Sequence, residues 1–114
     1  MQKKIVAILL LSIAITAQAG FIDGNTLVKY MAQWEIAAAK NPSADFMSAG
    51  EYRGYLLGVV DLSDQILFCT PDNSNARQLG AVVAAYLKAN PARWSEPAQK
   101  LVIAALAQSF PCKK

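Results

Sequence analysis

The sequence predicts an all-α fold, namely one small domain of about four helices held together by one disulfide. Apolar residues recur at positions i, i+3, i+4 and i+7 in every segment between breakers, whereas strict alternation of apolar and polar residues is nearly absent. Prolines and clusters of Asn, Asp and Ser separate these segments into four stretches of helical length. The chain has two cysteines, so one covalent bond between distant helices is possible.

Residues 1–19 are expected to be a signal peptide that is removed on export. Lys3 and Lys4 give a basic start, an apolar run follows, and Ala17-Gln18-Ala19 is a small-x-small cleavage pattern. The apolar run is shorter than the roughly 20 residues that span a bilayer, so no membrane anchor is expected. We therefore expect a single helical domain over residues 20–114, exported to the periplasm through the general pathway.

The first expected helix begins after Asp23 or Asn25 and runs to about Lys40. Its apolar stripe consists of Leu27, Met31, Trp34 and Ala38. The second begins at Ser48, which with Glu51 three residues later has the spacing of a capping box. Its expected core stripe consists of Tyr52, Tyr55, Leu56, Val59, Leu62, Ser63, Ile66 and Leu67.

The third expected helix begins at Asn75, which has capping-box spacing to Gln78, and it ends at Asn90-Pro91. Its stripe consists of Leu79, Val82, Val83, Tyr86 and Leu87. The fourth is capped by Ser95, has Pro97 in its first turn and ends at Phe110-Pro111. Its inward residues are Ala98, Leu101, Val102, Ala105 and Leu106.

A second face of the second helix carries Gly54, Gly58 and Asp61 at helical spacing. Glycine in a helix costs about 1 kcal/mol relative to alanine, so we expect a compensating close approach of another helix at this face. The alternative is that both glycines are tolerated and Asp61 is simply solvated.

Cys69 and Cys112 are expected to form a disulfide, because an even pair of cysteines in a small exported domain is typical of an oxidising compartment. The alternative is two free thiols. A bond between them would tie the end of the second helix to the end of the fourth, and the chain-entropy model gives about 4 kcal/mol for a loop of this length.

Composition argues against most catalytic and nucleic-acid-binding functions. The chain contains no histidine, the commonest general base and metal ligand. Removing Lys3 and Lys4 leaves nine scattered basic residues against eight acidic ones, so no basic nucleic-acid surface is expected. Asp61 and Asp64 could pair as carboxylates, but solvated aspartates are the stronger interpretation. We expect no catalytic residue, no metal and no cofactor, and hence no enzyme.

An ordered set of motifs gives the chain a family resemblance. The motifs are Gly24-Asn25-x-Leu27, Gly54-Tyr55-x-x-Gly58-Val59-x-Asp61, Cys69-x-Pro71, Gln78-Leu79-x-x-Val82-Val83-x-x-Tyr86-Leu87-x-x-x-Pro91, Pro97-Ala98-x-x-Leu101-Val102-x-x-Ala105-Leu106 and Phe110-Pro111-Cys112. This pattern resembles the Rap/Tai family of immunity proteins for type VI secretion amidase toxins, over nearly all of the mature chain.

The resemblance implies a small helical periplasmic protein, often a homodimer, that blocks a peptidoglycan-cleaving amidase by occluding its active site. The family pattern often has a second pair of cysteines, and the corresponding positions here look like Met31 and Tyr52. A methionine packed on a tyrosine is an apolar replacement for such a bridge.

The polar loop between the second and third helices is the expected contact surface for the toxin. Its residues are Asp72, Asn73, Ser74 and Asn75, followed by Arg77. Loops held by a rigid scaffold commonly carry recognition residues, although a merely solvated turn is the alternative. Trp94, in a short connection, either covers the edge of the core or anchors a partner, and covering the core is the favoured interpretation.

A periplasmic chaperone of the HdeA acid-stress type is the competing hypothesis, because such proteins are also small, exported and helical with one disulfide. Without histidine, a response to acid would have to come from the carboxylates, at roughly pH 3 to 5.

Overall fold

The computed structural model describes residues 20–113, and the predicted signal peptide lies outside them. Four α-helices follow in order, with a short 3-10 turn at Pro91–Arg93 before the last. The helices are α1 (Gly24–Ala38), α2 (Phe46–Ser63), α3 (Ala76–Ala89) and α4 (Ala98–Ser109). Between residues 20 and 113 no strand forms beyond two isolated bridges. The prediction of an all-α domain of about four helices is confirmed.

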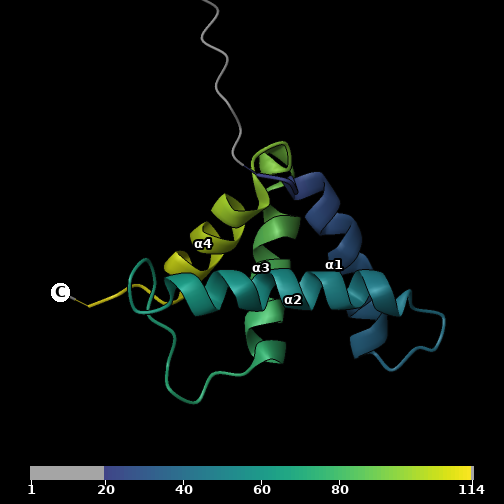
Figure 1. Ribbon diagram of the computed structural model, residues 1–114, viewed down its shortest axis with the longest axis horizontal. Coiled ribbons are helices and arrows are strands. Elements are labelled where there is room, and N and C mark those ends of the chain that lie inside the picture. The colour runs from purple at the N-terminus through teal and green to yellow at the C-terminus, as the bar shows by residue number, and fades with distance from the viewer. Residues whose placement is uncertain (1–19, 114) are drawn as a thin grey trace, which may run out of the picture.

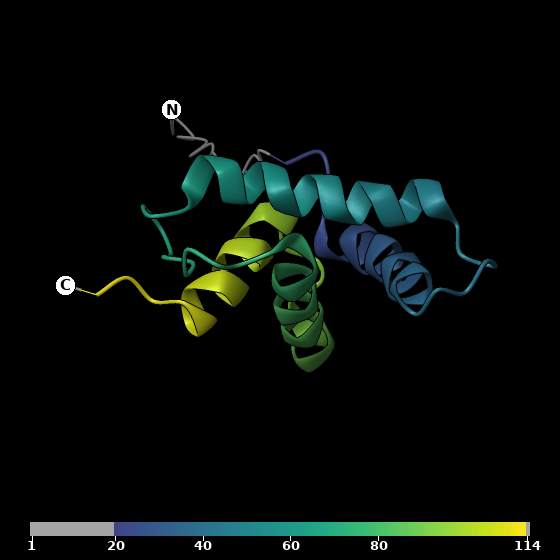
Figure 2. The same cartoon turned by 90° about the horizontal axis from the view of Figure 1, so that it is seen from below.

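Helix α2 forms a layer of its own across the other three helices (Figure 1). Seen along the perpendicular direction, α1, α3 and α4 lie on one side of α2, and no described helix lies on its other side (Figure 2). None of the helices described is both long and apolar enough to cross a membrane.

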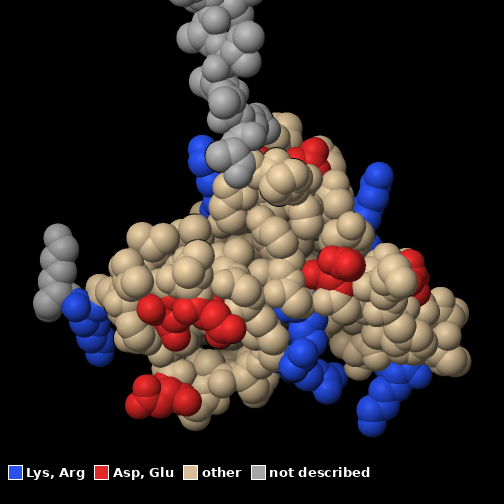
Figure 3. Space-filling model, in the orientation of Figure 1, with Lys and Arg blue, Asp and Glu red and all other residues tan. Residues whose placement is uncertain are grey.

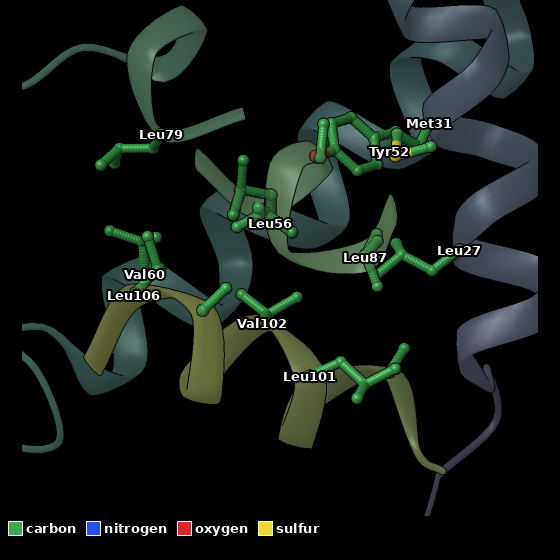
Figure 4. Close-up of a cluster of buried hydrophobic side chains, with 14 of the residues drawn as sticks. Leu27, Met31, Tyr52, Leu56, Val60, Leu79, Leu87, Leu101, Val102 and Leu106 are labelled. Atoms are coloured by element: carbon green, nitrogen blue, oxygen red, sulfur yellow. The ribbon is translucent and has the colours of Figure 1, made fainter. Parts of the chain in front are cut away.

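The core lies between α2 and the other three helices (Figure 4). Leu27, Leu56, Leu87, Leu101 and Leu106 come from all four helices and are fully buried. Burial of such a side chain stabilises the fold by about 1.5–3 kcal/mol, so this cluster is the main source of stability.

Side chains cap three of the four helices. Asp23, one of the two residues expected at the start of α1, accepts a hydrogen bond from the Thr26 backbone N–H at 2.8 Å. Asn75 accepts one from the Gln78 N–H at 2.9 Å, as the sequence predicts. Helix α2 instead begins two residues before the predicted Ser48. Asp45 caps the helix. The Ser48 hydroxyl donates to Asp45 Oδ2 at 2.8 Å, so the Asp45 carboxylate has the acceptor role that the sequence predicts for the Ser48 hydroxyl.

The prediction that Ser95 caps the last helix is wrong. Helix α4 begins at Ala98, after Pro97, and no side chain caps it. The segment before α1 takes over this role, since Ala98 N–H donates to the carbonyl of Ile22 at 2.9 Å. The beginning of the described chain is thereby fixed to the start of α4.

The prediction that the apolar stripe of α2 continues inward to its end is also wrong. Leu62, Ile66 and Leu67 are exposed, by 81%, 73% and 53% respectively. The reason is that the helix stops at Ser63 and the chain enters a turn, so the helical spacing no longer directs the last two residues to the core.

Met31 and Tyr52 lie side by side in the core (Figure 4). The Tyr52 hydroxyl donates to the carbonyl of Gly80 at 2.6 Å, and its ring centre is 5.1 Å from that of Trp34. Burial raises the pKa of the Tyr52 phenol, so it stays a neutral donor. These two positions contribute apolar packing between α1, α2 and α3.

Candidate partner-binding surface

The turn that follows α2 is organised around one carboxylate. Asp64 Oδ1 accepts hydrogen bonds from the backbone N–H groups of Thr70 and Gln65 at 2.9 and 3.0 Å, and Asp64 Oδ2 accepts one from the Thr70 hydroxyl at 2.7 Å. These donors, those of Thr70 first, hold the pKa of Asp64 below its ordinary value. The carboxylate therefore stays ionised and joins the two ends of the turn.

Backbone contacts close the same turn further. Gln65 lies in the left-handed region with φ 64°, and its N–H donates to the carbonyl of Phe68 at 2.7 Å. The N–H groups of Ile66 and Leu67 both donate to the carbonyl of Ser63. Phe68 itself is fully buried, so the turn is anchored in the core while Ile66 and Leu67 point to solvent.

The predicted disulfide is present next to this turn. Cys69 and Cys112 are bonded, with 4.9 Å between their Cα atoms, and Cys69 N–H donates to the carbonyl of Phe110 at 2.8 Å. The bond links the segment after α2 to the segment after α4. The described chain contains no free cysteine, which leaves no thiolate nucleophile there.

The polar loop continues from this clamp to α3. Asp72 and Asn73 are exposed, Ser74 is half-buried with its N–H donating to the carbonyl of Pro71 at 3.0 Å, and Asn75 caps α3. Between the loop and α2 lies a groove of about 420 Å³. Its lining includes apolar atoms of Leu57 and Leu79 and polar ones of Asp64, Asp72, Ser74 and Asn75.

The other two residues proposed as partner contacts lie away from the loop tip. Arg77 donates from Nη2 to the carbonyl of Ala38 at 3.3 Å, so its guanidinium points to the end of α1. Trp94 is half-buried and donates from Nε1 to the carbonyl of Leu87 at 2.8 Å. Trp94 lies beyond the far end of α3, about 20 Å along the helix axis from the loop. The structure thus does not bring Trp94 together with the polar loop.

The glycine face of α2 points to solvent. A Cβ placed on Gly54 or Gly58 would have no other atom within 4 Å, and Asp61 is exposed. Tyr55 is half-buried and its hydroxyl donates to Gln99 Oε1 at 3.4 Å. The expected close approach of another helix to this face therefore does not occur within residues 20–113.

A second groove, of about 580 Å³, lies between α1 and α3. Met31, Ala32, Ile36 and Ala39 give it an apolar wall, and Lys88 Nζ lies 2.8 Å from Glu35 Oε1 at its edge. Exposed ion pairs of this kind contribute little stability. Across residues 20–113 no group of three or more His, Cys, Asp or Glu side chains is placed to hold a metal ion.

The arrangement offers an exposed polar loop and two grooves to another macromolecule. A family model described as Rap1a immunity proteins matches residues 23–112. The chain belongs to this family. A search of curated proteins with this chain finds no match.

Family membership agrees with the geometry. The matched residues run from the cap of α1 to the cysteine after α4, so the match covers all four helices and the disulfide. Immunity proteins of this family act on a protein toxin and are generally not enzymes. The surface that contacts the toxin is consequently the functional site to look for.

Sequence reasoning missed one feature of the surface, the apolar group Leu62, Ile66 and Leu67, because helical spacing assigned these residues to the core. The only signal against that assignment is the polar pair Ser63-Asp64, which interrupts the apolar run. The sequence gives no sign that Gln65 adopts a left-handed backbone, because glycine is the residue usually found in that conformation.

Proposed function

We infer that this chain is a periplasmic immunity protein that binds a peptidoglycan amidase toxin delivered by type VI secretion and occludes its active site. The observation that carries the inference is the family match over residues 23–112. A rigid helical domain with exposed polar and apolar surface fits inhibition by steric blocking, which needs no chemistry from the inhibitor.

The periplasm is the compartment that suits this inference. Disulfides persist in oxidising compartments, and the bond between Cys69 and Cys112 is present in the structure. Residues 1–19 have the composition of a signal peptide, which would direct the chain there.

A homodimer is part of the same proposal. The outer face of α2 is unoccupied by the described chain around Gly54 and Gly58, and small residues let another helix backbone approach closely. Light scattering on the oxidised protein tests this, with a mass twice that of the mature chain as the expected result.

The proposed function is tested in cells that export the amidase encoded beside this gene to their own periplasm. We expect lysis, and we expect co-expression of the full chain to prevent it. A chain without residues 1–19, which stays in the cytoplasm, is the control and should not protect. The absence of a neighbouring amidase gene, or lysis despite co-expression, would contradict the proposal.

A further inference from the structure

Three large apolar side chains are exposed together at one end of α2. Leu62, Ile66 and Leu67 lie within six positions of one another, and each exposes more than half of its surface. Exposed groups of large apolar side chains on a monomeric protein are often functional. We call these three residues the apolar turn.

The apolar turn is held rigidly although its residues make no contribution to the core. Asp64 binds both ends of the turn through Thr70 and Gln65, Phe68 is fully buried beneath it, and the disulfide follows at Cys69. A residue other than glycine, Gln65, adopts a left-handed backbone to close it. Side chains displayed on an ordered turn lose little conformational entropy on binding, which favours affinity.

The charge around the apolar turn is predominantly negative, although Lys113 lies next to the disulfide-bonded Cys112 at the same end. The sequence contains no Lys or Arg between Arg53 and Arg77, while the same stretch carries Asp61, Asp64 and Asp72. Acidic side chains gather over the end of α2 and the loop below it, and a basic side chain lies at the same end beside the C-terminus (Figure 3). The remainder of the chain is net basic, so this end is electrostatically distinct.

This charge decides between two possible occupants of the apolar turn. A second copy bound through the same end would bring three aspartates and one lysine, Lys113, against the same set, and the excess of like charge at such an interface is unfavourable. A partner with Lys or Arg side chains around an apolar hollow would be attracted and would bury the three side chains at its centre.

We propose that the apolar turn, bordered by Asp61 and Asp72, is the surface that contacts the toxin, and that it binds an apolar hollow rimmed by basic side chains. This inference rests on the proposed function and assigns its contact surface. The apolar side chains supply the central anchors, as buried hot-spot residues do, and the aspartates accelerate encounter.

The test measures association and dissociation rates between the oxidised mature protein and the amidase encoded beside its gene. The first variant is Leu62→Gln with Ile66→Gln, for which we expect affinity to fall at least about tenfold, mainly through faster dissociation. Its matched control is Phe46→Gln with Met47→Gln. These two residues are similarly exposed at the other end of α2, and the control should bind within about twofold of the parent.

The second variant is Asp61→Asn with Asp72→Asn, which leaves Asp64 and the turn intact. We expect about tenfold slower association and a weaker dependence on salt. Its control is Glu51→Gln, an exposed acid on the other half of α2, which should leave the rate unchanged. Melting temperatures close to that of the parent protein check that each variant folds.

The outcomes separate this inference from the proposed function. Tight binding by the parent with unchanged binding by both turn variants would overturn the inference and leave the function standing. If Leu62→Gln with Ile66→Gln converts dimers to monomers while the affinity for the toxin is unchanged, a second copy is the occupant of the apolar turn. That result would also overturn the inference. Failure of the parent protein to bind the amidase would contradict both.

Discussion

Lys40 closes α1 in a conformation that suits glycine better than lysine. Its φ is 58°, its N–H donates to the carbonyl of Ala37, and the next N–H, of Asn41, donates to the carbonyl of Ile36. This is the pattern of a Schellman cap, in which the left-handed residue is usually glycine because a Cβ is unfavourable there.

We therefore expect Lys40→Gly to raise the free energy of unfolding by about 0.5–1 kcal/mol. The matched control is Lys29→Gly, in the exposed middle of α1, which should lower it by about 1 kcal/mol. Urea denaturation of both variants measures the difference. A loss of stability in both would contradict the described cap.

Stability should fall in acid because hydrogen-bond donors lower the pKa of several carboxyl groups. Thr26 donates to Asp23, Ser48 to Asp45 and Thr70 to Asp64, and each holds the pKa below the ordinary 3.8. The unfolded chain then binds protons more readily than the folded one, so this stabilisation is complete above the ordinary pKa and is lost as the pH falls through the lowered values.

Melting temperatures should thus be nearly constant from neutral pH to about pH 5 and decline below about pH 4. Asp45→Asn keeps a capping oxygen but cannot titrate, so its decline should be shallower. A parent protein that becomes more stable on acidification would contradict the assignment. Loss of compact structure with dye binding already at about pH 5 would favour the acid-stress chaperone hypothesis.

Among the elements, α3 is the one whose bounds sequence reasoning predicts best, and α2 the one it predicts worst. Asn75 and Asn90-Pro91 delimit α3 because local turn chemistry decides both ends. The end of α2 depends on Thr70, six residues beyond Asp64, and the start of α4 depends on a contact with Ile22. Contacts across the chain cannot be read from local spacing.

The glycines of α2 and α3 should respond oppositely to substitution. In dilute, monomeric protein, Gly54→Ala and Gly58→Ala should each raise the free energy of unfolding by about 1 kcal/mol, because within one chain a Cβ meets open space and alanine favours the helix. Gly80→Ala should lower it, because its Cβ would lie 2.7 Å from Trp34 Cζ2. Denaturant titrations compare the three; stabilisation by Gly80→Ala would contradict the packing of α3 on α1.

The molecule as a whole is tied together by its disulfide. The bond closes a loop of 43 positions, so the chain-entropy model predicts that replacing both cysteines by serine lowers the free energy of unfolding by about 4 kcal/mol. Thermal denaturation under oxidising conditions measures the loss. An unchanged melting temperature would mean that the bond contributes no constraint to the unfolded chain.

The candidate site could be predicted from the sequence only in part. The polar loop from Asp72 to Asn75 is recognisable from its turn residues, and the cysteine pair predicts the clamp beside it. The exposed apolar turn could not be predicted, because helical spacing places Leu62 inward. The remote position of Trp94 follows from the length of α3, whose two ends the sequence does predict.

We propose that this helical domain works by fitting onto a toxin. The most direct test titrates the oxidised protein into the amidase encoded beside its gene and follows cleavage of purified peptidoglycan. We expect cleavage to stop at an equimolar ratio and the protein alone to release no fragments. Full amidase activity in the presence of a large molar excess of the protein would contradict it.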